Sequence, residues 1–126
     1  MPILPAPVAA YLAAYNTRDV PAMLAGLDRD ITFQDLAGDC VTAEATGLAA
    51  FEELARAGVA AFATRHQAVR HAITVADTTL AEIDFTGTLR IDLPGLGAAG
   101  ETVNISGATL FRLAGGKITR IVDQHP

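Results

Sequence analysis

The sequence has no tryptophan, one cysteine, two tyrosines and three histidines among its 126 residues. A single cysteine, Cys40, excludes an intrachain disulfide and any zinc site built on cysteines. The histidines are scattered and lack His-x-x-x-His spacing, so there is no metal signature. The net charge is −5 with no basic cluster. We therefore expect neither nucleic acid nor a membrane surface as a partner.

Long hydrophobic runs are also missing. No apolar stretch approaches the roughly 18–20 residues that a membrane span needs, and the first residues lack the charged region of a secretory signal. Together with the lone cysteine, this indicates a cytoplasmic protein. A hydrophobic content of 51% over 126 residues is typical of one folded domain, residues 1–126.

What the sequence does contain is a pair of strongly alternating runs between Leu80 and Leu113. Alternation with a period of two predicts strands with one buried face. A loop rich in Pro and Gly, residues 94–100, separates the runs and predicts their connection. The residues expected on the buried face are Ala81, Ile83, Phe85, Gly87, Leu89, Ile91, Val103, Ile105, Gly107, Thr109, Phe111 and Leu113.

The rest of the chain predicts helices packed on this sheet. Helical spacing of apolar residues predicts helices over 6–17 and 47–63, the second capped by Thr46, and Asp19 is expected to cap a short helix between them. Strands are predicted at 31–35, 68–76 and 117–125, a loop at 36–46, and a hairpin at Gly115-Gly116. The expected fold class is α+β: a curved, mostly antiparallel sheet wrapped around three N-terminal helices, cone-shaped with an internal pocket.

Two carboxylates are candidates for proton transfer in this pocket. Asp35 follows Ile31 and Phe33 on one strand face, where burial can tune a carboxylate as a base; the alternative is an Asp that caps the following loop. Asp123 shares a face with Ile121 and is either a second acid or base, or an exposed terminal residue.

Other candidates are hydroxyl, imidazole and aromatic side chains. Tyr11 lies on the apolar face of the first helix and can donate to a developing oxyanion, or is amphipathic core. Thr109 is the only residue with a hydroxyl group expected on the buried face of its strand. His125 is two residues after Asp123 and is therefore expected on the same strand face. Substrate contacts are therefore expected from Thr109, Phe33, Phe85 and His125. Tyr15 is expected in the core, His71 in the core or in an interface, and His66 in solvent.

The chain resembles the nuclear transport factor 2-like superfamily, which includes ketosteroid isomerase, limonene epoxide hydrolase and SnoaL-type polyketide cyclases. The resemblance covers nearly the whole chain and rests on four segments: residues 11–19 (YLAAYNTRD), 31–35 (ITFQD), 47–51 (GLAAF) and 110–118 (LFRLAGGKI). These segments are typical of the fold, which hosts many functions.

The resemblance implies roles for individual residues. The oxyanion Tyr and the Asp base of ketosteroid isomerase fall on Tyr11 and Asp35, whereas its protonated Asp falls on Thr109, a weaker donor. In the limonene epoxide hydrolase pattern, Gly116 to Thr119 are followed by Asp123, but no Arg partner is evident, since Arg90 falls on the outer face. Such enzymes need no metal or organic cofactor, so none is expected here.

Three functions remain open from the sequence. The first is a cofactor-independent acid–base enzyme, an isomerase or polyketide cyclase, acting on a hydrophobic carbonyl compound through Asp35, Tyr11 and Asp123. The second is water addition to an epoxide around Asp123. The third is a module that only binds a small molecule or dimerises. A homodimer is expected through the outer sheet face, which carries Thr86, Thr88, Ala108 and Leu110.

Overall fold

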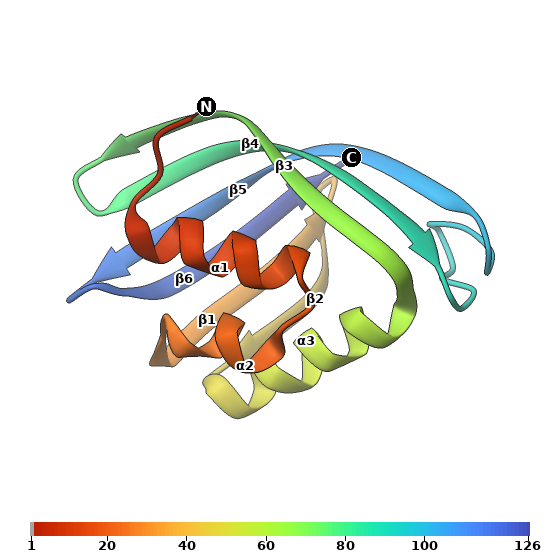
Figure 1. Cartoon of the computed structure of the whole chain (residues 1–126), viewed down its shortest axis with the longest axis horizontal. Helices are drawn as coiled ribbons and strands as arrows, with labels where there is room; N and C mark the ends of the chain where they lie inside the picture. Colours follow the sequence, from red (N-terminus) through yellow and green to blue (C-terminus); the bar gives the residue numbers. More distant parts are fainter. Residues whose placement is uncertain (1) are drawn as a thin grey trace.

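The chain forms three helices and one curled, open sheet (Figure 1). The computed structural model describes residues 2–126. The sheet has six strands in the order β2-β1-β6-β5-β4-β3. The helices are α1 (Ala6–Asn16), α2 (Val20–Ala25) and α3 (Leu48–Ala61), and the strands are β1 (Leu27–Ala37), β2 (Cys40–Thr46), β3 (Phe62–Val75), β4 (Thr78–Leu89), β5 (Thr102–Ala114) and β6 (Lys117–His125). The predicted α+β class is confirmed.

The sheet bends around the helices, which lie on its concave side (Figure 1). The main core gathers side chains of α1, α2 and α3 against β1, β4, β5 and β6. A smaller second cluster centres on Ala61, Phe62 and Leu89, with Phe85 packed against it. In residues 2–126, no helix is long and apolar enough to cross a membrane.

The starts of the helices follow local chemistry. The carboxylate of Asp19 accepts a hydrogen bond from the backbone N–H of Ala22 at 3.1 Å, so the predicted cap of α2 is confirmed. The predicted cap of α3 is wrong. Gly47, not Thr46, occupies that position with φ of 87°, a conformation that favours glycine, and Thr46 ends β2 with an exposed side chain.

The segment predicted as a loop, 36–46, instead contains the end of β1 and all of β2, which pair antiparallel. Only Ala45 of β2 is buried. An edge strand with so little buried surface shows no apolar alternation, and this explains the wrong prediction.

The antiparallel order β3-β4-β5-β6 is the one expected from the sequence. The parallel pairing of β1 with β6 was not predicted. It joins a strand from the first third of the chain to the last strand, and it places Asp35 opposite Asp123.

Two irregularities change which residues face inward. A register shift between Arg112 and Leu113 leaves both Ile118 and Ile121 buried, at 0% and 1% exposure. Strict alternation along residues 117–125 would place Thr119 on the face of Ile121, but the shift removes it from that face. A second shift, after Val69 in β3, turns His71 outward, so His71 does not lie in the core; its predicted alternative, a place in an interface, stays a prediction. His66 is exposed, as predicted.

Candidate functional site

A row of polar side chains crosses the concave face of the sheet where three strands meet. Asp35 on β1 is the register partner of Asp123 on β6, which is in turn the partner of Thr109 on β5. Register partners on neighbouring strands present their side chains to the same face. On either side the row continues as alanine, with Ala43 on β2 and Ala81 on β4, so small side chains flank the polar groups.

The groups of the row hydrogen-bond to one another and to two neighbours. The Thr109 hydroxyl, 4% exposed, donates to Oδ1 of Asp123 at 2.7 Å. Nε2 of His125 lies 3.0 Å from Oδ2 of Asp35, and both side chains are 28% exposed. The Thr42 hydroxyl also donates to Oδ2 of Asp35. Asp35 and His125 therefore form a half-buried pair beside the more deeply held Asp123.

The environment of Asp123 suits proton transfer near neutral pH. Burial raises the pKa of Asp123 from 3.8 to about 6, and the negative charge of Asp35 raises it further, while the Thr109 hydrogen bond and His125 act in the opposite direction. Two carboxylates on one face of the sheet thus differ in their neighbours, as in enzymes that divide acid and base roles between such a pair.

Tyr11 lies behind the row on α1. It is 7% exposed, and its ring packs edge-on against Phe111, with centroids 5.9 Å apart, and tilted against Phe51 at 6.3 Å. Burial and the charge of Asp123 raise the pKa of Tyr11 well above its usual range. Tyr11 is therefore a neutral phenol close to Asp123.

The aromatic candidates divide between two places. Phe33 lies next to the row and packs edge-on against Phe51 at 5.5 Å. Phe85 instead packs against Phe62 at 5.3 Å, in the second cluster. The structure thus brings together Asp35, Asp123, Thr109, His125, Tyr11 and Phe33, and it leaves Phe85 apart from them.

Sequence reasoning missed four side chains around the site. Thr42 was hidden in the segment predicted as a loop. Tyr15 packs against the main core as predicted, but its place near the carboxylates was missed: burial, together with the charges of Asp123 and Asp35, raises the pKa of its phenol. Arg65 is only 8% exposed and stacks its guanidinium 3.8 Å from the ring centroid of Tyr15. Arg65 and Gln67 alternate with outward-facing residues of β3, and this alternation could have indicated that both face inward.

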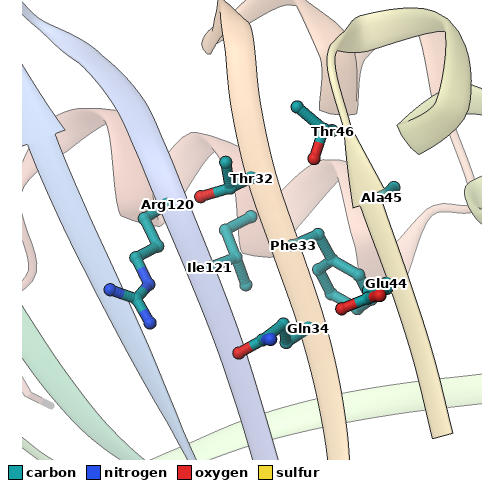
Figure 2. Close-up of a pocket in the computed structure, with 8 residues that line it drawn as sticks. All are labelled: Thr32, Phe33, Gln34, Glu44, Ala45, Thr46, Arg120 and Ile121. Atoms are coloured by element: carbon teal, nitrogen blue, oxygen red, sulfur yellow. The ribbon is translucent and has the colours of Figure 1, made fainter. Parts of the chain in front are cut away.

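Two surface hollows adjoin this region from outside. The first, of about 350 Å³, lies over β2, β1 and β6, where Thr32, Gln34, Glu44 and Arg120 project (Figure 2). These side chains alternate with Phe33 and Asp35 and so belong to the opposite, outer face of the sheet. It is therefore a different place from the polar row.

The second hollow lies where β6 ends beside β5. It is shallow, has a volume of about 370 Å³, and is lined by Gly38, Ser106, Gly107, Ala108, Gln124, His125 and Pro126. His125 thus contacts Asp35 on one side and borders open space on the other. Within residues 2–126, no three His, Cys, Asp or Glu side chains gather closely enough to hold a metal ion.

The fold and the row define an α+β domain with acid–base groups on the concave face of its sheet. A family model described as the SnoaL-like domain matches residues 8–121. The chain belongs to this family, and the predicted resemblance to the nuclear transport factor 2-like superfamily is confirmed. A search of curated proteins found no match.

Solved structures share the fold over most of their length. A candidate polyketide cyclase from Xanthomonas campestris is 27% identical, with a TM-score of 0.75 over 95% of this chain and 87% of the other. A second candidate polyketide cyclase, from Pseudomonas putida, is 25% identical, with a TM-score of 0.75 over 94% and 88%. A protein of ketosteroid isomerase-like fold from Catenulispora acidiphila, in complex with trimethylamine, is 23% identical, with a TM-score of 0.79 over 96% and 85%.

Proposed function

We propose that the chain is a cofactor-independent acid–base enzyme of the isomerase or polyketide cyclase type. Its substrate is a hydrophobic small molecule with a carbonyl group, and the reaction moves a proton on the carbon next to that carbonyl. One observation carries the proposal: Asp35, Asp123 and Thr109 stand in register on the concave face, and burial raises the pKa of Asp123 to about 6. A base is most effective when its pKa lies near the working pH.

In this proposal each group has a separate task. Asp123 removes the proton, and protonated His125, oriented by its contact with Asp35, gives one to the substrate from the open side. Asp123 then loses its proton to solvent and His125 takes one from solvent, so both groups return to their starting states. The neutral phenol of Tyr11 donates to the enolate oxygen that develops. Phe33 and the neighbouring aromatic rings bind the apolar body of the substrate. The likeness to candidate polyketide cyclases supports a cyclase or isomerase of this kind.

The arrangement favours this reaction over the two alternatives. Water addition in the epoxide hydrolase manner needs an Arg beside the carboxylates, but within residues 2–126 the side chains that hydrogen-bond to Asp35 and Asp123 are Thr42, His125 and Thr109. A purely binding module does not need a carboxylate with a raised pKa, and such groups are concentrated at catalytic sites.

The test is exchange of substrate C–H for deuterium in D₂O, followed by NMR on a panel of steroid enones, polyketides and simple ketones. Exchange should fall by about 10²–10⁴ in Asp123→Asn, the usual contribution of one proton-transfer group. Asp35→Asn should also slow it by disturbing His125. Asp77→Asn removes an exposed carboxylate at the β3–β4 turn and is the matched control. Equal exchange in Asp123→Asn and the control would refute the proposal.

A further inference from the structure

Arg65 is a buried cation without a carboxylate partner. Its side chain reaches inward from β3 and is 8% exposed, yet no ion pair among residues 2–126 uses it. Its Nε is the one buried side-chain N or O atom in that range with no hydrogen-bond partner. Burying an unpaired guanidinium costs free energy. Neighbouring groups must therefore stabilise Arg65 in this position.

The surroundings of Arg65 come from all three helices. The guanidinium carbon lies 3.8 Å from the ring centroid of Tyr15 on α1, and Nη2 lies 4.0 Å from the sulfur of Met23 on α2. On α3, a Cβ added to Gly58 would come within 3.1 Å of Nη1. A glycine in mid-helix costs stability relative to alanine, and here it leaves the space that the guanidinium fills.

Tyr15, the residue whose ring Arg65 covers, is also within the electrostatic influence of both carboxylates of the row. The groups that act on its phenol are Arg65 from β3, Asp123 from β6 and Asp35 from β1, besides the hydrogen bond from Gln67. The backbone of Gln67 is itself fixed by Asn16, whose side chain donates to its carbonyl at 3.0 Å and accepts from its N–H at 2.8 Å. The ring face of Tyr15 is therefore covered by Arg65, beside a β3 segment whose backbone is fixed by Asn16.

We propose that Arg65 is a positioning residue for the candidate site, which holds the Tyr15 ring by stacking and sets a positive charge behind its phenol. Tyr15 then serves as a second hydroxyl donor to the substrate oxygen, beside Tyr11. The positive charge makes the phenol a stronger donor than burial alone would leave it. The role given to Tyr15 rests on the proposed function, whereas the hold of Arg65 on Tyr15 does not.

The chain allows a direct test because it contains two tyrosines and no tryptophan. Both tyrosines are replaced by 3-fluorotyrosine, whose phenol ionises at lower pH, and the two ¹⁹F resonances are assigned with Tyr11→Phe and Tyr15→Phe. Arg65→Met keeps the length and loses the charge, so it should raise the pKa of Tyr15 by about 1 or more. Arg65→Lys should raise it less. Arg90→Met, which removes an exposed arginine, is the control.

A second measurement reports on the site. 4-Nitrophenolate serves as a mimic of an enolate oxygen, and Arg65→Met should weaken its binding by about two- to tenfold, as for coupled residues in contact. In the Tyr15→Phe background the same change should have no further effect. Gly58→Ala places a methyl group close to Nη1 of Arg65 and leaves the charge of Arg65 in place. It should shift the Tyr15 resonance, and it provides a test in a folded chain if Arg65→Met does not fold.

The outcomes separate the two proposals. An unmoved Tyr15 pKa in Arg65→Met, or an unmoved Tyr15 resonance in Gly58→Ala, would overturn the role of Arg65. Equal weakening of 4-nitrophenolate binding with and without Tyr15 would overturn the action through Tyr15. Absence of deuterium exchange in the unmodified chain would defeat the proposed function while leaving the titration of Tyr15 as a valid test of Arg65.

Discussion

Asp35 and Asp123 are register partners on the parallel strands β1 and β6, so two carboxylates that are far apart in the sequence face one side of the sheet. The two differ in what they contact. Asp123 is bonded by the buried hydroxyl of Thr109, whereas Asp35 pairs with His125 at the rim. This asymmetry governs how the protein should respond to pH and to mutation.

The pH dependence of stability should report on Asp123. Its pKa is about 6 in the folded chain against 3.8 ordinarily, so between these values the folded state binds more protons than the unfolded state. The free energy of unfolding should therefore fall as pH rises through this window and stay lower above it. Asp123→Asn should remove this decrease and stabilise the protein at pH 8 by up to about 3 kcal/mol, measured by urea unfolding at several pH values. A fall of the same size in Asp123→Asn would contradict the assignment.

The Thr109 hydroxyl should contribute more to the free energy of unfolding than an exposed hydroxyl on the same sheet. Thr109→Val keeps the shape but leaves the Asp123 carboxylate without its donor, which should cost about 1.5–3 kcal/mol at pH 8. It should also move the pKa of Asp123 further upward, because this bond lowers it. Thr102→Val, which breaks the exposed Thr88–Thr102 contact, is the matched control. NMR titration of the Asp123 carboxyl and urea unfolding measure both effects.

Gly87 should tolerate no side chain. It faces inward on β4, and an added Cβ would lie 2.8 Å from Cδ1 of Phe62 and 3.0 Å from Cζ of Phe85. Gly87→Ala should therefore destabilise the fold by about 1–3 kcal/mol through overpacking. At Gly26 the nearest atom would be 4.0 Å away, so Gly26→Ala should be neutral or stabilise by up to about 1 kcal/mol. Thermal unfolding of the two variants side by side provides the comparison, and equal melting temperatures would refute this account.

We expect the protein to form a homodimer through the outer sheet face. Ile73, Leu80, Leu110 and Val122 are successive register partners across β3, β4, β5 and β6. Ile73 and Leu80 are 65% and 45% exposed. Light scattering should give twice the chain mass of 13.1 kDa, and Leu80→Glu should return it to one chain mass because a charge in an apolar interface is costly.

The control for the dimer is Val41→Glu. Val41 is 51% exposed but lies on β2, away from this stripe, so the variant should keep the dimer mass. A single-chain mass for the unmodified protein would show that the stripe has no partner copy.

Local pattern predicted much of the fold because most elements bury a regular stripe. Asp123 and Thr109 could be placed inward from the alternation around Ile121 and Phe111, and Asp19 from its capping chemistry. Alternation failed at the two register shifts, which moved Thr119 and His71, because an extra residue in a strand leaves no mark in the sequence. It also failed at β2, whose surface is almost all exposed.

The site itself was only partly predictable. Asp35 and His125 are 90 residues apart, and nothing local indicates that their strands pair in parallel. Arg65 was missed for a different reason. Arginine is rarely buried, so a sequence pattern that would place it on the inner face is ordinarily disregarded. Its burial depends on the stacked ring of Tyr15 and the space left by Gly58, which only the three-dimensional arrangement reveals.

The position of β6 between β1 and β5 also affects how the protein folds. Asp35 and Asp123 contact His125 and Thr109 only when β6, residues 117–125, is paired with both β1 and β5. We therefore expect the polar row to assemble only when the sheet as a whole forms, because its contacts join residues that are far apart in the sequence and such contacts form slowly.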